Sequence, residues 1–125
     1  MKIKLKQLDG VYAIAQLSHH DEIPKWVDGS GFVNISRTDD ELSLVCLEER
    51  VPAEVKIDGG WICFKFLGPF AFGEAGVILS VIRPLSENGI GIFVVSTFNG
   101  DVLLLKHSDV ENALKLILES GHIVE

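Results

Sequence analysis

Short segments in which apolar residues alternate with polar ones, or form continuous apolar runs, occur along the whole chain. A period of two is typical of a half-buried strand, and a short apolar run is typical of a buried one. Because lysines on a strand discourage aggregation at a sheet edge, we expect the lysine-rich first segment at an edge. The pattern predicts strands at residues 2–8, 11–17, 32–36, 42–47, 61–67, 91–97, 101–106 and 122–125.

One segment of the second half repeats apolar residues with helical spacing. The predicted helix begins at about Glu74 and ends at Asn88-Gly89, a usual stop signal. Pro84 lies inside it and has no N–H for the carbonyl of Ser80, so we expect a kinked or short last turn. The stripe predicted to cover a sheet consists of Val77, Ile78, Val81, Ile82 and Leu85.

A second helix is predicted after residue 107. Ser108 and Glu111 have the spacing of a capping box, which marks a helix start, and Gly121 stops the helix. Its apolar face is expected to comprise Val110, Ala113, Leu114, Ile117 and Leu118.

The elements after the Asp58-Gly59-Gly60 turn signal follow the order β-α-β-β-α-β. This order predicts a ferredoxin-like unit, in which helices cover one face of an antiparallel four-stranded sheet. The first half repeats the strands of the second but is shorter where a first helix would lie, which indicates a tandem duplication. We therefore expect an α+β chain with a degenerate, helix-poor unit at 1–57 and a complete unit at 58–125. The degenerate unit would have to cover its apolar face with the second unit or with another chain.

The composition is that of an ordinary globular protein, with 125 residues, 47% hydrophobic residues and a net charge of −7. This charge argues against nucleic acid and against an anionic membrane surface as partners. No apolar run approaches the ~18 residues of a membrane span, and the N-terminus lacks the apolar core of a signal peptide. We therefore expect a cytoplasmic protein.

Candidate catalytic and metal-binding residues are few. Cys46 and Cys63 lie in strand-like runs without a Cys/His cluster, so we interpret them as buried free thiols. The histidines and acids of residues 19–22 are neighbours in one loop, a poor geometry for converging on a metal ion. The acidic residues 39–41 are most simply interpreted as a solvated turn. No nucleophile–base motif or P-loop is present. We expect no cofactor, no metal and no enzymatic activity.

Residues 67–76 (Leu-Gly-Pro-Phe-Ala-Phe-Gly-Glu-Ala-Gly) connect a strand to a helix and combine three features of a ligand site. Gly68, Gly73 and Gly76 allow the backbone to approach a small molecule closely. The first turn of the helix offers unpaired N–H groups and the positive end of its dipole. Glu74 adds a carboxylate that could receive an ammonium group. The alternative is that these glycines only make a tight crossover.

Three motifs resemble the ACT domain family: Gly-Glu-Ala-Gly at 73–76, Pro-Leu-Ser-Glu-Asn-Gly-Ile-Gly-Ile-Phe at 84–93 and Ser-Thr-Phe-Asn-Gly-Asp at 96–101. The match is similar to the ACT pair of aspartate kinases and to the cytosolic arginine sensor of animals, which has an aromatic residue in place of Gly100. The resemblance implies a regulatory fold that binds amino acids between two ACT units. Carried over by position, the ligand-binding residues would be Leu67, Gly68, Gly73, Glu74, Ala75, Gly76, Thr97, Phe98 and Asp101.

The sequence therefore predicts a small regulatory or sensor protein that binds an amino acid or a similar ligand. Its expected partners are that ligand and a second copy of the chain or another regulated protein, because sheet edges and a half-covered unit need partners. The alternative is an assembly module without a ligand.

Overall fold

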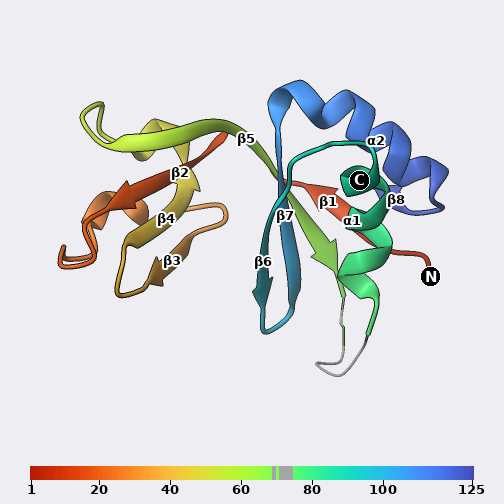
Figure 1. The fold of residues 1–125 in the computed structure, drawn as a ribbon, viewed down its shortest axis with the longest axis horizontal. Coiled ribbons are helices and arrows are strands. Elements are labelled where there is room, and N and C mark those ends of the chain that lie inside the picture. Colours follow the sequence, from red (N-terminus) through yellow and green to blue (C-terminus); the bar gives the residue numbers. More distant parts are fainter. Residues whose placement is uncertain (69, 71–74) are drawn as a thin grey trace. The chain divides into compact units, whose positions relative to one another are not determined.

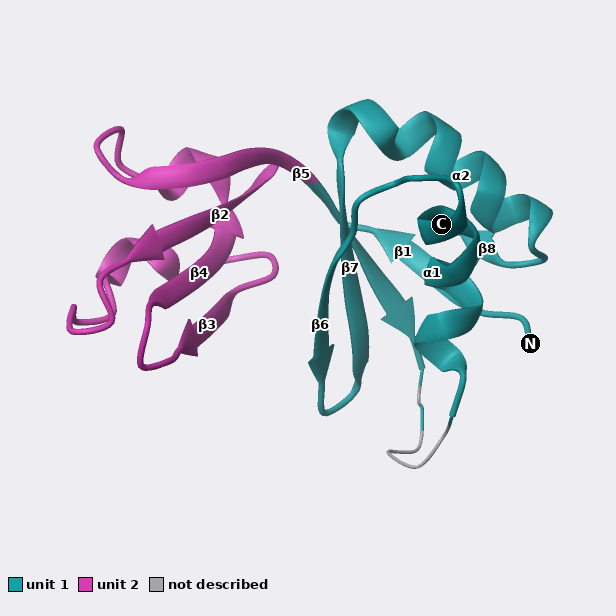
Figure 2. Cartoon of the chain, viewed as in Figure 1, with its two compact units in different colours: residues 1–8, 62–125 teal, residues 9–61 magenta. Residues whose placement is uncertain are grey.

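A computed structural model describes residues 1–68, 70 and 75–125, and Figure 1 shows their arrangement as helices and strands. The chain is of the predicted α+β class. It divides into two compact units, one made of Met1–Leu8 and Ile62–Glu125 and the other of Asp9–Trp61 (Figure 2). No helix among the described residues is long and apolar enough to cross a membrane.

The larger unit contains a sheet in the order β6-β7-β5-β1-β8, with two helices. Its elements are β1 (Lys4–Gln7), the second half of β5 (Lys56–Leu67), α1 (Val77–Glu87), β6 (Phe93–Thr97), β7 (Gly100–Lys106), a 3-10 turn (His107–Asp109), α2 (Val110–Glu119) and β8 (Ile123–Val124). From β5 onward this is the predicted β-α-β-β-α-β order. The helices pack on one face of the sheet, where Ile62, Phe64 and Phe66 of β5 alternate into the core as expected.

The N-terminal strand β1 is an addition to the expected four-stranded sheet. Lys4–Gln7 pairs antiparallel with β5, and Lys4 and Leu5 pair in parallel with β8. The prediction that this strand lies at an edge is therefore wrong. Leu5 is completely buried, and its lysine neighbours remain exposed. Because of these pairings residues 1–8 lie in the larger unit, whereas the sequence pattern placed them with residues up to 57.

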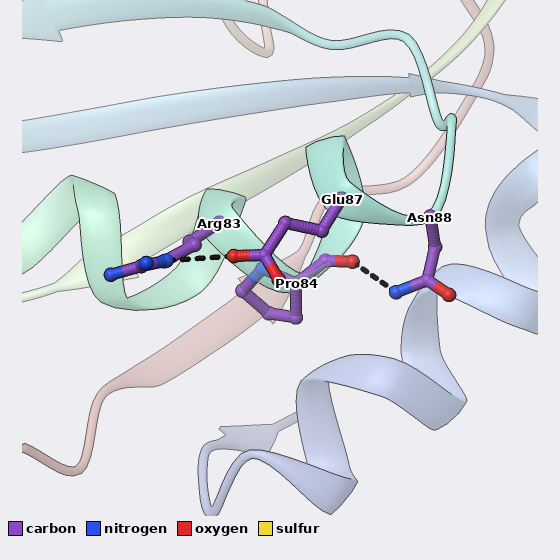
Figure 3. Close-up of polar contacts among 4 residues, drawn as sticks. All are labelled: Arg83, Pro84, Glu87 and Asn88. Carbon is purple, nitrogen blue, oxygen red and sulfur yellow. Dashed lines mark hydrogen bonds and ion pairs between the residues drawn. The ribbon is translucent and has the colours of Figure 1, made fainter.

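Helix α1 continues through Pro84 and ends where predicted. At its C-terminus the Asn88 side-chain nitrogen donates to the Pro84 carbonyl at 2.6 Å, and Arg83 pairs with Glu87 at 2.7 Å (Figure 3). Gly89 follows with φ of +76°, a conformation that costs glycine little. The helix starts at Val77 instead of Glu74, with Gly76 at its N-cap.

Helix α2 starts later than the capping-box spacing predicts. A 3-10 turn takes up Ser108, and α2 begins at Val110 after Asp109, without a side-chain cap. Ser108 is therefore inside the preceding turn and is not the N-cap. Ala113 and Ile117 are buried as predicted, but Leu118 is 56% exposed.

The smaller unit contains strands and two 3-10 turns (Figure 2). Its elements are β2 (Tyr12–Leu17), a turn at Lys25–Val27, β3 (Asn34–Arg37), β4 (Leu42–Leu47), a turn at Glu48–Arg50 and the first half of β5. The order β3-β4-β2 repeats the order β6-β7-β5 of the larger unit, as the internal duplication predicts. The expected turn at Asp58–Gly60 lies inside β5, where Gly60 has φ of +77° and the register with β2 shifts.

This helix-poor unit covers an apolar face with its own loop, contrary to the expectation that another unit or chain must do so. Val27 and Trp26 of the 3-10 turn pack on a core of Ala15, Leu42, Leu44 and Cys46.

Two side chains secure this loop. The Arg50 guanidinium donates to the carbonyls of Val27 and Ser30, and the Tyr12 hydroxyl accepts from the N–H of Phe32 at 3.0 Å. These bonds hold the loop against the core of the smaller unit.

Candidate functional site

The end of β5 and the turn between β6 and β7 lie side by side, so two of the predicted site segments meet. A Cβ added to Gly68 would lie 3.3 Å from the Asn99 carbonyl oxygen and 2.9 Å from the Phe70 nitrogen. A Cβ added to Gly100 would lie 3.6 Å from the Phe66 carbonyl oxygen. Gly68 therefore permits a close approach of backbone segments that a larger side chain would hinder, whereas Gly100 is favoured by its φ of +150°.

The turn presents an ordered set of polar groups at the surface. The Ser96 hydroxyl donates to the Asp101 carboxylate at 2.6 Å, and the Thr97 hydroxyl donates to the Gly100 carbonyl at 2.6 Å. Asp101 is half-buried, whereas Phe98 is 79% exposed at the tip of the turn. The Ser96 bond orients the carboxylate, and Phe98 offers an uncovered aromatic ring.

The N-terminus of α1 provides backbone donors. Gly76 adopts φ of +83° at the N-cap, where a residue with a side chain would be strained, and among the described residues no side chain caps the helix. The first helical bond runs from the Ser80 N–H to the Gly76 carbonyl at 3.0 Å. The N–H groups of residues 77–79 thus have no partner within the helix.

Of the other predicted site residues, the structure describes two and does not describe the other two. Leu67 ends β5 and is half-buried, and Ala75 is exposed just before the N-cap. Gly73 and Glu74 lie outside the described residues. A carboxylate, an aromatic ring and a helix N-terminus are groups that suit a small zwitterion, with the carboxylate for an ammonium group and the helix N-terminus for an acid.

Sequence reasoning missed the role of His122, the buried polar residue of the described chain that ties α1 in place. His122 is 3% exposed, and its Nδ1 accepts the Ile3 N–H at 3.0 Å. Its Nε2 lies 3.0 Å from the Ser80 carbonyl oxygen, so Nε2 carries the proton and the ring is the neutral tautomer. The carbonyl of Ser80 is the one that Pro84 leaves without a helical donor. The sequence showed that this carbonyl needs another donor, but it did not show which residue supplies it.

The smaller unit has two surface depressions that contain none of the predicted site residues. One of about 550 Å³ is lined by Gln16, Glu41, Ser43, Lys56 and Asp58 together with smaller and apolar neighbours. The other, of about 470 Å³, lies between the 9–11 turn and residues 47–49.

The two thiols are buried and free, as predicted. Burial raises the pKa of Cys63 to about 12. Burial also raises the pKa of Cys46, although the nearby Arg50 charge acts in the opposite direction. Such thiols are inert at neutral pH, because the thiolate is the reactive form. Among the described residues, no group of three His, Cys, Asp or Glu side chains could hold a metal ion.

Comparison with known proteins places the chain in a family. The model of the ACT domain matches residues 56–119, and a second model, described as an N-terminal domain, matches residues 10–54. A search of curated proteins returned no match.

Solved structures agree with the family match. A protein from Agobacterium tumefaciens is 59% identical over 100% of this chain and 93% of its own, with a TM-score of 0.96. A C-terminal regulatory domain of aspartate kinase from Porphyromonas gingivalis is 15% identical, with 94% of both chains covered and a TM-score of 0.60. E. coli aspartokinase III, solved with aspartate and ADP, is 10% identical, with a TM-score of 0.65 over 94% of this chain and 32% of the enzyme. The last two show the shared fold. The ACT model spans more than half of the sequence, and the chain therefore belongs to the ACT domain family.

Proposed function

We propose that this chain is a small regulatory protein that binds an amino acid, or a similar small zwitterion, beside the N-terminus of α1. Membership of the ACT family and the likeness to regulatory domains of aspartate kinase indicate a regulatory role in place of catalysis. The proposal adds the ligand class and its position.

The observation that carries the proposal is the contact between the end of β5 and the β6–β7 turn. Gly68 lies against Asn99, so the segment that leads into α1 is next to the turn that holds Asp101. An ammonium group would bind the oriented carboxylate of Asp101, and a ligand carboxylate would bind the N–H groups of residues 77–79, which have no acceptor within the helix. Glu74, outside the described residues, is a proposed second acid for the same ligand.

Thermal unfolding in the presence of each of the twenty amino acids tests the proposal. A ligand at ~100 times its Kd adds ~2.7 kcal/mol to the free energy of unfolding, which raises Tm by several degrees. We expect one amino acid, or a few related ones, to produce this shift. The absence of any shift at millimolar concentrations would contradict the proposal.

The variant Asp101→Asn then locates the ligand. It removes the charge but keeps a side-chain oxygen for the Ser96 hydroxyl. We expect it to abolish most of the ligand-induced shift while leaving Tm without ligand nearly unchanged. Asp109→Asn is the matched control, because Asp109 is also a half-buried aspartate of the larger unit but lies at the start of α2. Equal losses in the two variants would place the ligand elsewhere.

The alternative function, assembly without a ligand, rests on β6. This strand is at an edge of its sheet and pairs with β7 as its one strand partner among the described residues. Its residues Phe93, Val94 and Val95 are half-buried and uncharged. Self-association that is indifferent to amino acids would favour this alternative.

A further inference from the structure

The acidic residues of this protein are concentrated in one of its two units. Residues 9–61 contain eleven Asp and Glu against four Lys and Arg, whereas residues 1–8 and 62–125 contain seven of each. The whole net charge of −7 therefore belongs to the smaller unit. The ion pairs Lys4–Glu125 and Arg83–Glu87 lie in the larger unit, so they do not neutralise this charge.

The strand β3 forms an open edge of this acidic unit. Asn34–Arg37 pairs with β4, its one strand partner in the part of the chain that the structure describes, and ends the sheet order. Figure 2 shows it as an outer strand of the magenta unit. Ile35 is 41% exposed on this edge, and Ser36 and Arg37 are exposed as well. An edge strand presents backbone N–H and C=O groups to which another strand can add.

The cation of β3 does not protect this edge. The Arg37 guanidinium turns back to donate to the carbonyl oxygens of His19 and Asp21. It therefore binds main chain, and within the described residues it forms no ion pair with a carboxylate. The same bonds hold the acidic segment at Asp21 and Glu22 next to the end of the strand.

A second acidic segment is fixed at the same end. The Thr38 hydroxyl accepts from the N–H groups of Asp40 and Glu41 at 3.1 and 3.2 Å, and the Thr38 N–H donates to the Glu41 carbonyl at 2.9 Å. Asp39 and Asp40 are exposed on this turn. The open edge is therefore bordered by carboxylates on two ordered segments.

We propose that the β3 edge is a docking site for an extended, basic segment of a partner protein, which adds to the sheet as a further strand. Backbone bonds to the edge would supply the pairing, as in other β-augmentation complexes. Because β3 has only four residues, these bonds are few. Lysine or arginine side chains of the partner, next to the two acidic segments, would supply the remaining attraction and the selectivity.

Charge also decides against a second copy of this chain as the occupant. Two smaller units brought edge to edge would each carry a net charge of −7, and like charges across an interface are unfavourable. The β3 site is thus distinct from self-association through β6, which lies in the electrically balanced unit.

The proposal can be tested with the full chain and two synthetic peptides, one of alternating lysine and valine and one of alternating glutamate and valine. Hydrogen exchange of the backbone amides, followed by NMR, reports where a peptide pairs. We expect the lysine peptide to slow exchange at residues 34–37 and to bind more weakly as salt is raised. Equal binding of the glutamate peptide, protection of β6 in place of β3, or no change at millimolar lysine peptide would each overturn the proposal.

Matched variants separate the charge from the strand edge. The double change Asp39→Asn and Asp40→Asn should weaken lysine-peptide binding roughly two- to thirtyfold, the range for two exposed ion pairs. The control Glu111→Gln and Glu119→Gln removes two exposed charges from α2 and should leave binding unchanged.

A lysine placed on the edge tests the pairing itself. Ile35→Lys should remove the protection of β3, whereas Val95→Lys on β6 should not. Circular dichroism of each variant confirms that it is folded. Docking at β3 would be contradicted if the Asp39/Asp40 and Glu111/Glu119 double variants lost the same amount of lysine-peptide binding. Undiminished protection of residues 34–37 in Ile35→Lys would contradict it as well.

Discussion

At the scale of single residues, the thiol of Cys63 shows how burial alone changes chemistry. Its side chain is completely buried, and its pKa is raised to about 12 from the ordinary value of 9.0. In the unfolded chain the thiol ionises from about pH 9, whereas in the folded protein it stays protonated until about pH 12. The contribution of Cys63 to stability is therefore complete below pH 9 and is lost as the pH rises to 12.

Urea unfolding at a series of pH values tests this consequence. Between pH 9 and pH 12 the free energy of unfolding should fall more steeply for the wild-type chain than for Cys63→Ala, which has no thiol to ionise. Below pH 9 the two proteins should differ by a constant amount that reflects the cavity. Parallel curves across pH 9–12 would contradict the assigned pKa.

At the scale of secondary-structure elements, the helix α1 depends on a residue far along the chain. Pro84 cannot donate to the Ser80 carbonyl, and His122 supplies the missing donor while accepting from Ile3. The His122 imidazole thus pairs with the Ser80 carbonyl of α1 and with the Ile3 N–H just before β1, and both of its ring nitrogens have a partner. The helix continues through Pro84, and the Ser80 carbonyl that lacks a helical donor keeps a partner in His122.

The variant His122→Ala leaves the Ile3 N–H and the Ser80 carbonyl without their partner. We expect a loss of about 2–6 kcal/mol in the free energy of unfolding, since two groups lose their partner and each unsatisfied group costs about 1–3 kcal/mol. Urea denaturation measures this loss.

Pro84→Ala provides the matching test, because alanine restores an N–H in reach of the Ser80 carbonyl. Pro84→Ala should therefore be more favourable in the His122→Ala background than in the wild-type chain, by about 1 kcal/mol. Additive effects of the two substitutions would show that they do not share this carbonyl.

At the scale of the whole molecule, the two units differ in charge and in the edges they expose. The larger unit is electrically balanced and ends in β6, an uncharged edge strand. The smaller unit carries the net charge and ends in β3. Balanced charge removes a barrier to self-association, so the expected homodimer is more consistent with β6 than with β3.

Sedimentation tests this assignment. We expect the wild-type chain to sediment as a dimer and Val95→Lys to shift toward monomer, because a lysine on an edge strand opposes strand pairing. Ile35→Lys, the same kind of change on β3, should leave the dimer intact. A monomeric wild-type chain, or a dimer unaffected by Val95→Lys, would contradict self-association through β6.

The candidate site was predictable as two sequence segments, and its ligand stays a prediction. Gly76 and the 96–101 turn carry local signals, because a positive φ or a hairpin depends on neighbouring residues. The contacts of Gly68 with Asn99 and of Gly100 with Phe66 join residues about thirty positions apart. Such contacts depend on which strands become neighbours, and local patterns do not specify that.

The sequence by itself determined the α+β class, most strands, both helices and the stripes they bury, because side-chain periodicity reports which face of an element meets the core. Only the tertiary structure decided that β1 lies between β5 and β8, that a loop with Trp26 covers the helix-poor unit, and that His122 completes α1. The physical reason is that a local pattern shows what an element must bury or pair. Which distant residue satisfies that need is decided when the whole chain packs.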